Sequence, residues 1–228
     1  MKYRNLIIIG TSHIARQSLE EVARTIRKTE PEIVAVELDR RRFAALVHEQ
    51  QRKLRLRDIR RIGLKGYLFN LVGAWIEKKL GKLVGVKPGS EMLAAIRLAK
   101  QYGAKVALVD QDIEVTLARL SKGITWKEKF RFIWDLIRSP FTGKQELKRL
   151  GISKLDLTKV PSKKVIRKLT GYVKEKYPNV YRVLVEERNK VIAVNLRGLM
   201  KHFQDKQILA VIGAGHEEDV MELVKKGL

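Results

Sequence analysis

The amino-acid sequence predicts an α/β fold with a mostly parallel central sheet flanked by helices, and with basic helical insertions that form a cap. Short apolar runs typical of buried parallel strands recur along the chain, and amphipathic helical segments stand between them. Lys and Arg residues concentrate outside these units. Because 228 residues suffice for one sizeable core, we expect a single domain over residues 1–228 with insertions at about 40–87 and 114–176.

Four segments are expected to be buried strands, since each is a short apolar run bounded by polar or turn residues. They are residues 5–10, 32–38, 104–110 and 207–213. An amphipathic helix after the first run ends before Pro31, which makes a βαβ unit with the second strand. A second unit has Ser90 as the helix N-cap and Gly103 as the stop before the third strand, and a long helix from near Pro178 leads into the fourth.

The composition excludes several classes of protein. The chain has no Cys, so disulfides, thiolate catalysis and sulfur-ligated metal sites are excluded. A hydrophobic fraction of 45% beside 32% charged residues is typical of a globular protein rather than a disordered or membrane-spanning one. The N-terminal apolar run is too short for a signal peptide, and no run of about 18 apolar residues occurs. We therefore expect a cytoplasmic location.

The charge is strongly basic, with 48 Lys and Arg against 25 Asp and Glu and a net charge of +23. Basic residues crowd segments 51–67 and 148–177. Such a field attracts anionic membrane surfaces and phosphate polymers, although a Cys-free surface rich in Lys, Arg and Glu is also typical of thermophilic proteins. Specific nucleic-acid recognition is not favoured, because no aromatic-interleaved basic motif or zinc-finger spacing accompanies the charge.

Aromatic residues are dense in both insertions. They occur within residues 69–81 of the first, and as Trp126, Phe130, Phe132 and Trp134 in the second. The plainest interpretation is the apolar face of cap helices, and contact with a partner or a membrane surface is the alternative.

Histidines and carboxylates follow the predicted strands. These are His13 after the first, Glu37 and Asp39 after the second, Asp110 and Asp112 after the third, and His216 after the fourth. In an open parallel sheet these ends share one edge, where ligands bind. Both histidines stand in a G-x-x-H pattern, GTSH and GAGH, and this matched context favours a site over two structural imidazoles. Such side chains suit Mn, Fe, Co or Zn, or an acid–base pair.

Some of these carboxylates have an alternative role. Asp39 could instead cap the helix that follows it, which makes Glu37 the stronger site candidate. One of Asp110 and Asp112 could likewise be an N-cap.

Helical phase draws attention to Glu187. On a regular helix over about 179–203, the apolar face consists of Val180, Val183, Leu184, Val191 and Val194. Glu187 falls on this face and is expected to point inward, where a buried carboxylate needs a partner such as Arg188 or a metal ion. A structural Glu–Arg pair that joins the helix to the sheet is an equal alternative.

Seven stretches of the chain together resemble the TraB/PrgY family of pheromone-shutdown proteins, which is related to the TIKI proteases and GumN. The stretches are GTSH-x4-S, PEIVAVELDRRR, GAWIEKKLG, PGSEMLAAI, LVDQDIEVTLARL, VEERN and VIGAGH. The resemblance implies an EreA/ChaN-like α/β fold and a metal-dependent protease or hydrolase. Many members continue into a hydrophobic region after the second G-x-x-H, so membrane association is expected if this chain is part of a longer protein.

Carried over by position, the resemblance implies His13, His216 and Glu37 as metal ligands. It also places Glu91, Asp110, Glu187 and Arg188 in the site. One departure is Gln111, because the family commonly has Asp-Arg-Asp where this chain has Asp-Gln-Asp. The missing arginine bears on recognition of substrate charge and on activity.

The leading functional hypothesis is a hydrolase that acts on a peptide or small-molecule substrate with a divalent ion, Mn, Co, Fe or Zn. Its ion would be held by His13, His216 and an acidic residue, and would carry the attacking water. Glu37 or Glu187 would be a ligand or general base, and Arg188 would stabilise developing negative charge. The alternatives are a peptide-binding or sequestering module without turnover, and a basic cap that binds membrane or nucleic acid above a scaffold sheet.

Overall fold

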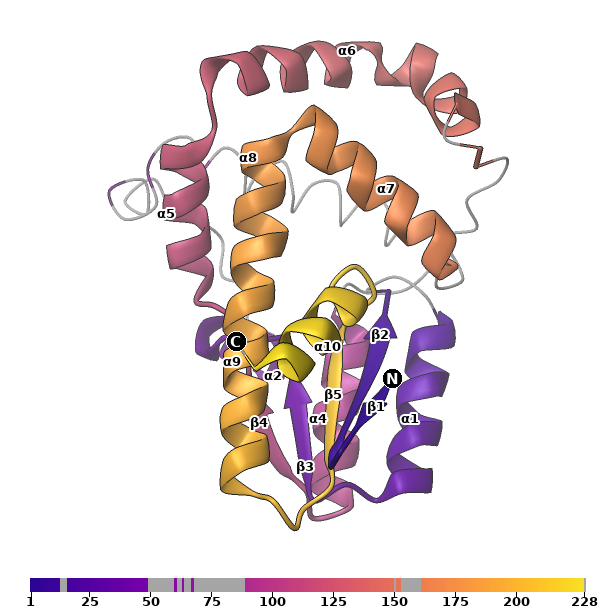
Figure 1. Ribbon diagram of the computed structural model, residues 1–228, viewed down its shortest axis with the longest axis vertical. Helices are drawn as coiled ribbons and strands as arrows, with labels where there is room; N and C mark the ends of the chain where they lie inside the picture. The colour runs from indigo at the N-terminus through magenta and orange to yellow at the C-terminus, as the bar shows by residue number, and fades with distance from the viewer. Residues whose placement is uncertain are drawn as a thin grey trace.

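The computed structural model describes residues 1–12, 16–48, 60, 63, 67, 89–149, 151–152 and 161–227. Its centre is a five-stranded sheet with helices on both faces (Figure 1). The strands are β1 (Lys2–Tyr3), β2 (Leu6–Thr11), β3 (Ile33–Val36), β4 (Lys105–Leu108) and β5 (Ile208–Gly213). Their spatial order is β1-β2-β5-β3-β4. The predicted α/β class with a mostly parallel sheet is confirmed.

The four predicted strands are present and parallel to one another. Strand β5 lies between β2 and β3, with Ile208 opposite both Leu6 and Ile33. Because β5 is buried along its whole length, its sequence is a continuous apolar run rather than an alternating one. The antiparallel β1 was not predicted, since two residues are too few to form a pattern.

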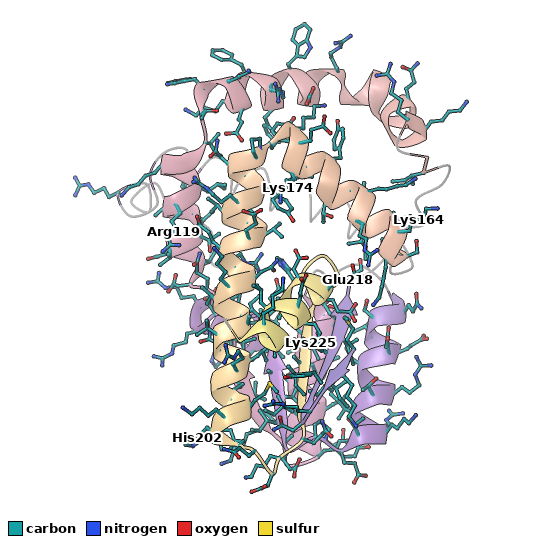
Figure 2. All side chains as sticks on the ribbon, viewed as in Figure 1. Arg119, Lys164, Lys174, His202, Glu218 and Lys225 are labelled. Carbon is teal, nitrogen blue, oxygen red and sulfur yellow. The ribbon has the colours of Figure 1, made fainter. Side chains whose placement is uncertain are left out.

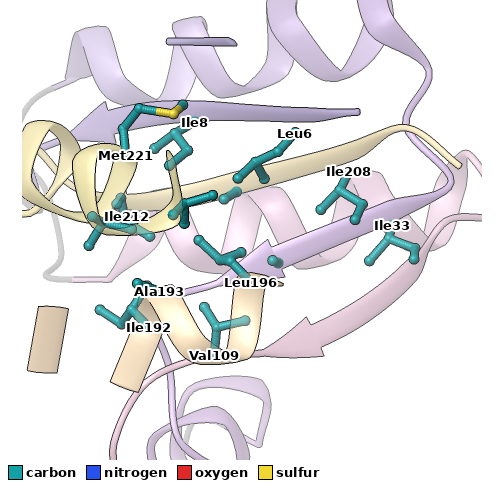
Figure 3. Close-up of a cluster of buried hydrophobic side chains, with 14 residues drawn as sticks. Leu6, Ile8, Ile33, Val109, Ile192, Ala193, Leu196, Ile208, Ile212 and Met221 are labelled. Atoms are coloured by element: carbon teal, nitrogen blue, oxygen red, sulfur yellow. The ribbon is translucent and has the colours of Figure 1, made fainter. Parts of the chain in front are cut away.

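Two hydrophobic cores lie on the two faces of the sheet. Helices α1 (Arg16–Thr29) and α4 (Ser90–Gln101) cover one face, and α9 (Glu187–His202) and α10 (Glu217–Lys226) cover the other. Figure 3 shows the second core, in which Leu6, Ile208 and Ile212 of the sheet meet Leu196 of α9 and Met221 of α10. Fully burying one such side chain stabilises the fold by about 1.5–3 kcal/mol.

The start of α4 differs by one residue from the prediction. Gly89 is the N-cap, with φ of +79° in the left-handed region, and Ser90 is the first helical residue. Gly103, with φ of +70°, follows the end of this helix as expected.

The helical segment that leads into β5 contains a π-turn. It consists of α8 (Pro178–Tyr181), the π-turn (Arg182–Glu186) and α9. A π-turn holds about one residue more than an α-turn, so every later side chain is rotated by about 100° from its expected direction. The apolar face predicted for a regular helix is therefore wrong beyond the π-turn: Val194 is 56% exposed, whereas Ile192 and Leu196 are fully buried.

Further helices lie near the carboxyl ends of the strands. They are α2 (Arg40–Val47), α5 (Ile113–Gly123), α6 (Trp126–Arg149) and α7 (Lys163–Lys176). Figure 1 shows α6 and α7 beyond the carboxyl ends of the sheet. Nearly all of the first predicted insertion after α2, including residues 69–81, lies outside the described residues. Within the described ranges, no helix is both long and apolar enough to cross a bilayer.

Two carboxylates on one side of α6 attach it to the α7–α8 junction. Glu128 is 4% exposed and accepts hydrogen bonds from the backbone N–H of Asn179 at 2.8 Å and from its Nδ2 at 2.9 Å. Asp135 accepts from the Tyr177 hydroxyl and pairs with Lys176 Nζ at 2.7 Å. Burial alone would raise the pKa of both carboxyl groups, but these hydrogen bonds lower each pKa below its ordinary value.

This attachment should weaken in acid. A carboxyl group whose pKa is lower in the folded than in the unfolded state stabilises the fold fully above the unfolded pKa, and this contribution is lost as the pH falls through the folded pKa. We expect Glu128→Gln to lower the free energy of unfolding by about 1–3 kcal/mol at pH 7 and by much less at pH 3. Urea unfolding at several pH values measures this, with Glu175→Gln on exposed α7 surface as the control. Equal losses at both pH values would contradict the assignment.

Candidate functional site

The candidate site lies where three parallel strands end and α9 begins. Glu37 follows β3, Asp110 follows β4, and His216 follows β5. Arg188 is the second residue of α9, directly after the π-turn. The sequence predicts that these three strand-end residues converge at one edge of the sheet, and the structure brings them together around Arg188.

Glu37 is the buried carboxylate that His216 faces. It is 3% exposed, and its Oε2 accepts a hydrogen bond of 2.5 Å from the backbone N–H of Gly213 at the end of β5. Its Oε1 accepts a hydrogen bond from Arg188 Nη2 and lies 3.6 Å from His216 Nε2. The strand pairing of β3 with β5 thus holds this carboxylate in place from one side, and α9 holds it from the other.

Arg188 forms the centre of an ion-pair network. Its Nε and Nη2 donate to the two oxygens of Asp110 at 3.1 and 2.5 Å, in addition to the contact with Glu37. Burial alone would lower the pKa of Arg188, but the Glu37 and Asp110 carboxylates raise it above its ordinary value. Arg42 on α2 pairs with Asp110 as well, and also with Asp39 at 2.7 Å. The guanidinium of Arg188 is therefore a permanent charge in a fixed position.

The imidazole of His216 is oriented by a chain of two hydrogen bonds. Its Nδ1 lies 2.5 Å from Asn189 Oδ1, and Asn189 Nδ2 donates to Asp219 Oδ2 at 3.1 Å. Because an ionised Asp only accepts, the Asn189 amide must direct its NH₂ to Asp219 and its oxygen to His216. Nδ1 then carries the proton, which leaves the Nε2 lone pair facing Glu37 and Arg188.

Sequence reasoning missed Asn189, Asp219 and Arg42. Asn189 is 2% exposed and stands beside Arg188 in the VEERN stretch. Its inward direction depends on the π-turn, which has no sequence signal that we recognised. Asp219 is three residues after His216 and is exposed, so position alone does not distinguish it from its acidic neighbours.

Glu187 does not take the predicted direction. Its side chain is 24% exposed and pairs with Arg119 of α5 at 2.9 Å, and with Arg182 at 3.9 Å. The expectation that it points inward was wrong, because the π-turn brings Arg188 and Asn189 to the inner face instead.

Asp39 is an N-cap, and of Asp110 and Asp112 the N-cap is Asp112. Asp39 accepts from the backbone N–H groups of Arg41 and Arg42 at the start of α2, and Asp112 accepts from that of Glu114 at the start of α5. Gln111, at the position of the departure from the family pattern, is 7% exposed and donates to Thr116 Oγ1 at 2.8 Å. Its amide therefore extends the α5 contacts and not the ion-pair network.

Glu91 and His13 are the two remaining residues of the predicted site. Glu91 is 1% exposed in the first turn of α4, on the face of the sheet opposite α9. His13 lies outside the described residues. The strand that precedes it ends at Thr11, which is paired with Gly213 of β5.

The described donors fit part of a metal site. No group of three or more His, Asp or Glu side chains is placed to hold a metal ion within the described ranges. His216 Nε2 and Glu37 Oε1 are 3.6 Å apart. Two ligands of a tetrahedral ion with bonds of about 2.1 Å are about 3.4 Å apart, so this pair suits two of its positions. An ion there would compete with Arg188 for Glu37 Oε1.

A small pocket adjoins the loop that carries His216. It has a volume of about 70 Å³, and it lies between α7, Tyr181 and the β5–α10 connection. Its lining includes Gly215, Asp219 and the paired side chains of Arg167 and Glu218, which are 2.7 Å apart. The lining therefore contains the neighbours of His216 in the chain, and its imidazole is not part of it.

Comparison with known proteins identifies the relatives of the chain. The model of the TraB/PrgY/gumN family matches residues 2–226. An uncharacterized protein of Methanocaldococcus jannaschii is 38% identical over 224 residues, which cover 97% of this chain and 54% of that protein. Proteins named TraB domain-containing protein from Homo sapiens and Mus musculus are each 23% identical over 235 residues, which cover 92% of this chain and 60% of theirs. The chain thus spans little more than half the length of these relatives.

Proposed function

The chain belongs to the TraB/PrgY/gumN family, and from this premise we propose that it is a hydrolase of peptides that uses a divalent metal ion. Family membership alone does not fix an activity, so the proposal rests on the site. The observation that carries it is the position of the His216 imidazole, which is oriented from behind by Asn189 and directs Nε2 toward Arg188 and the buried Glu37 carboxylate, 3.6 Å away.

His216 has the properties of a metal ligand or a general base. With Nδ1 protonated and hydrogen-bonded, Nε2 is held in one direction, toward Glu37 and Arg188. His216 Nε2 and Glu37 are the described residues that would hold the ion, with His13 as the predicted third ligand. When bound, such an ion supplies a Lewis acid that polarises a carbonyl group and lowers the pKa of water.

Arg188 supplies a fixed positive charge beside these groups. Its raised pKa keeps it protonated throughout the physiological range, and its salt bridges with Asp110 and Glu37 limit its movement. A preorganised cation stabilises the negative oxygen that develops when a carbonyl is attacked, because no rearrangement is needed at that moment.

The test is cleavage of peptides by the purified chain. The chain is stripped with a chelator, reloaded with Mn, Co, Fe or Zn, and incubated with a peptide mixture, and new termini are detected by mass spectrometry. We expect His216→Ala to lower the turnover at least about 100-fold and to reduce the bound metal. His202→Ala is the matched control, because His202 is exposed at the far end of α9 (Figure 2) and should leave both unchanged. Full activity in His216→Ala would overturn the proposal.

A second candidate is a peptide-binding module without turnover. It is favoured by Arg188, whose salt bridges already occupy Glu37 and Asp110, and by Gln111, whose amide is engaged by Thr116 where the family has Arg. In the same incubations this candidate requires a peptide that binds, remains intact, and is bound equally well after metal removal.

A further inference from the structure

Helix α6 carries an exposed aromatic stripe, which we define as Trp126, Phe130 and Trp134. The three side chains follow one another at intervals of four residues, so they lie on one face of the helix. They are 69%, 70% and 59% exposed, and the rings of Trp126 and Phe130 are 6.2 Å apart. Solvent exposure of three large aromatic side chains in a row is unfavourable in water, which indicates that the stripe has a partner.

The opposite face of α6 explains why the stripe points outward. Glu128, Arg131 and Asp135 lie on that face and bind the α7–α8 junction, Arg131 through a hydrogen bond of 2.8 Å to the Lys176 carbonyl oxygen. Phe132 packs edge-on against Tyr177 at 6.1 Å. These contacts fix the rotation of α6, and Figure 2 shows its other side chains projecting away from the rest of the molecule.

Cationic side chains flank the stripe. Lys129 Nζ lies 3.6 Å from the Trp126 ring centre, and the Arg138 guanidinium lies 5.4 Å from that of Trp134. Lys127 is exposed next to them. Aromatic side chains on one face with Lys and Arg along its edges are typical of helices that lie in the interface of an anionic bilayer.

We propose that α6 docks onto an anionic lipid bilayer with its helix axis parallel to the membrane plane. The aromatic stripe then lies in the interfacial region, and Lys127, Lys129 and Arg138 lie near the headgroups. The charge of the chain, +23, supports a negatively charged partner. It argues against a second copy as the occupant, because two such helices would bring their basic flanks together. This surface is separate from the His216 site, so the proposal stands independently of the proposed hydrolase.

Vesicle binding tests the stripe. The whole chain is mixed with vesicles of phosphatidylcholine containing phosphatidylserine, and binding is measured by co-sedimentation and by the blue shift of tryptophan emission. We expect the triple variant Trp126→Ser, Phe130→Ser, Trp134→Ser to bind at least about 100-fold more weakly. The control is Val115→Ser with Val194→Ser, which removes exposed apolar side chains from α5 and α9 and should bind like the unchanged chain.

A charge variant tests the flanks. Lys127→Glu, Lys129→Glu and Arg138→Glu should weaken binding to anionic vesicles at least about tenfold more than Lys28→Glu, Lys201→Glu and Lys225→Glu. Both triple variants have the same net charge, and five of the six residues are exposed, with Lys129 half-buried. If the two triple variants weakened vesicle binding equally, binding would depend only on the total charge of the chain, and the proposal would be overturned. The proposal would also be overturned if the stripe were needed for binding to RNA but not to vesicles. A dimer in solution that the stripe variant abolishes would overturn it as well.

Discussion

Replacing Arg188 with Met is expected to lower the free energy of unfolding by about 3–5 kcal/mol. The substitution removes the cation that pairs with two deeply buried carboxylates, the Glu37 and Asp110 side chains, which are 3% and 0% exposed. Both would remain in a poorly solvated region, with Arg42 as the remaining counterion of Asp110. Urea or guanidinium unfolding measures the difference, provided that the transition remains two-state.

Two companion variants make this result specific. Arg119→Met removes an arginine that is 54% exposed and pairs with Glu187, so its loss should be below about 1 kcal/mol. Adding Glu37→Gln to Arg188→Met should recover part of the stability, because the buried negative charge of Glu37 is then absent. If Arg188→Met and Arg119→Met lowered the free energy of unfolding by the same small amount, the ion-pair network would not have the buried character described above.

The second large effect is expected in the helix that follows the π-turn. Leu196→Ala should lower the free energy of unfolding by about 2–5 kcal/mol, because Leu196 is fully buried between α9 and the sheet and its truncation leaves a cavity. Val194→Ala, two residues earlier, should change it by no more than about 0.5 kcal/mol, since that side chain is 56% exposed.

This pair of variants distinguishes the observed helix from a regular one. On a regular helix from 179 to 203, Val194 belongs to the apolar face and its truncation would be the costly one. Thermal or denaturant unfolding of the two variants side by side shows whether the helix has the rotation that follows a π-turn or that of a regular helix. A larger loss for Val194→Ala than for Leu196→Ala would contradict the π-turn.

The sheet could be predicted because a strand that is covered on both faces has a recognisable local sequence pattern. Each parallel strand contains a continuous apolar run of at least three residues, and this pattern does not depend on what the strand packs against. The same pattern predicts that Glu37, Asp110 and His216 lie at one edge, because parallel strands end on the same side. The spatial order of the strands, with β5 between β2 and β3, is not indicated by any comparable local pattern.

The hydrogen-bond partners in the site could not be predicted from the sequence. Asn189 and Asp219 orient His216 through contacts that bring α9 and α10 together, and each residue has acidic or basic neighbours that are equally good candidates by position. Likewise, whether Asp39 caps α2, pairs with Arg42 or does both is decided only when the backbone direction after β3 is known.

The sequence by itself determined the α/β class, the four parallel strands, and the edge at which Glu37, Asp110 and His216 gather. Tertiary structure alone decided that Arg188 and Asn189, and not Glu187, face this edge. The physical reason is the π-turn at Arg182–Glu186, in which one additional residue per turn rotates the rest of α9 by about 100°. Such a turn is stable here because the rotated helix buries Ile192 and Leu196 against the sheet, and that gain arises only when the two elements meet.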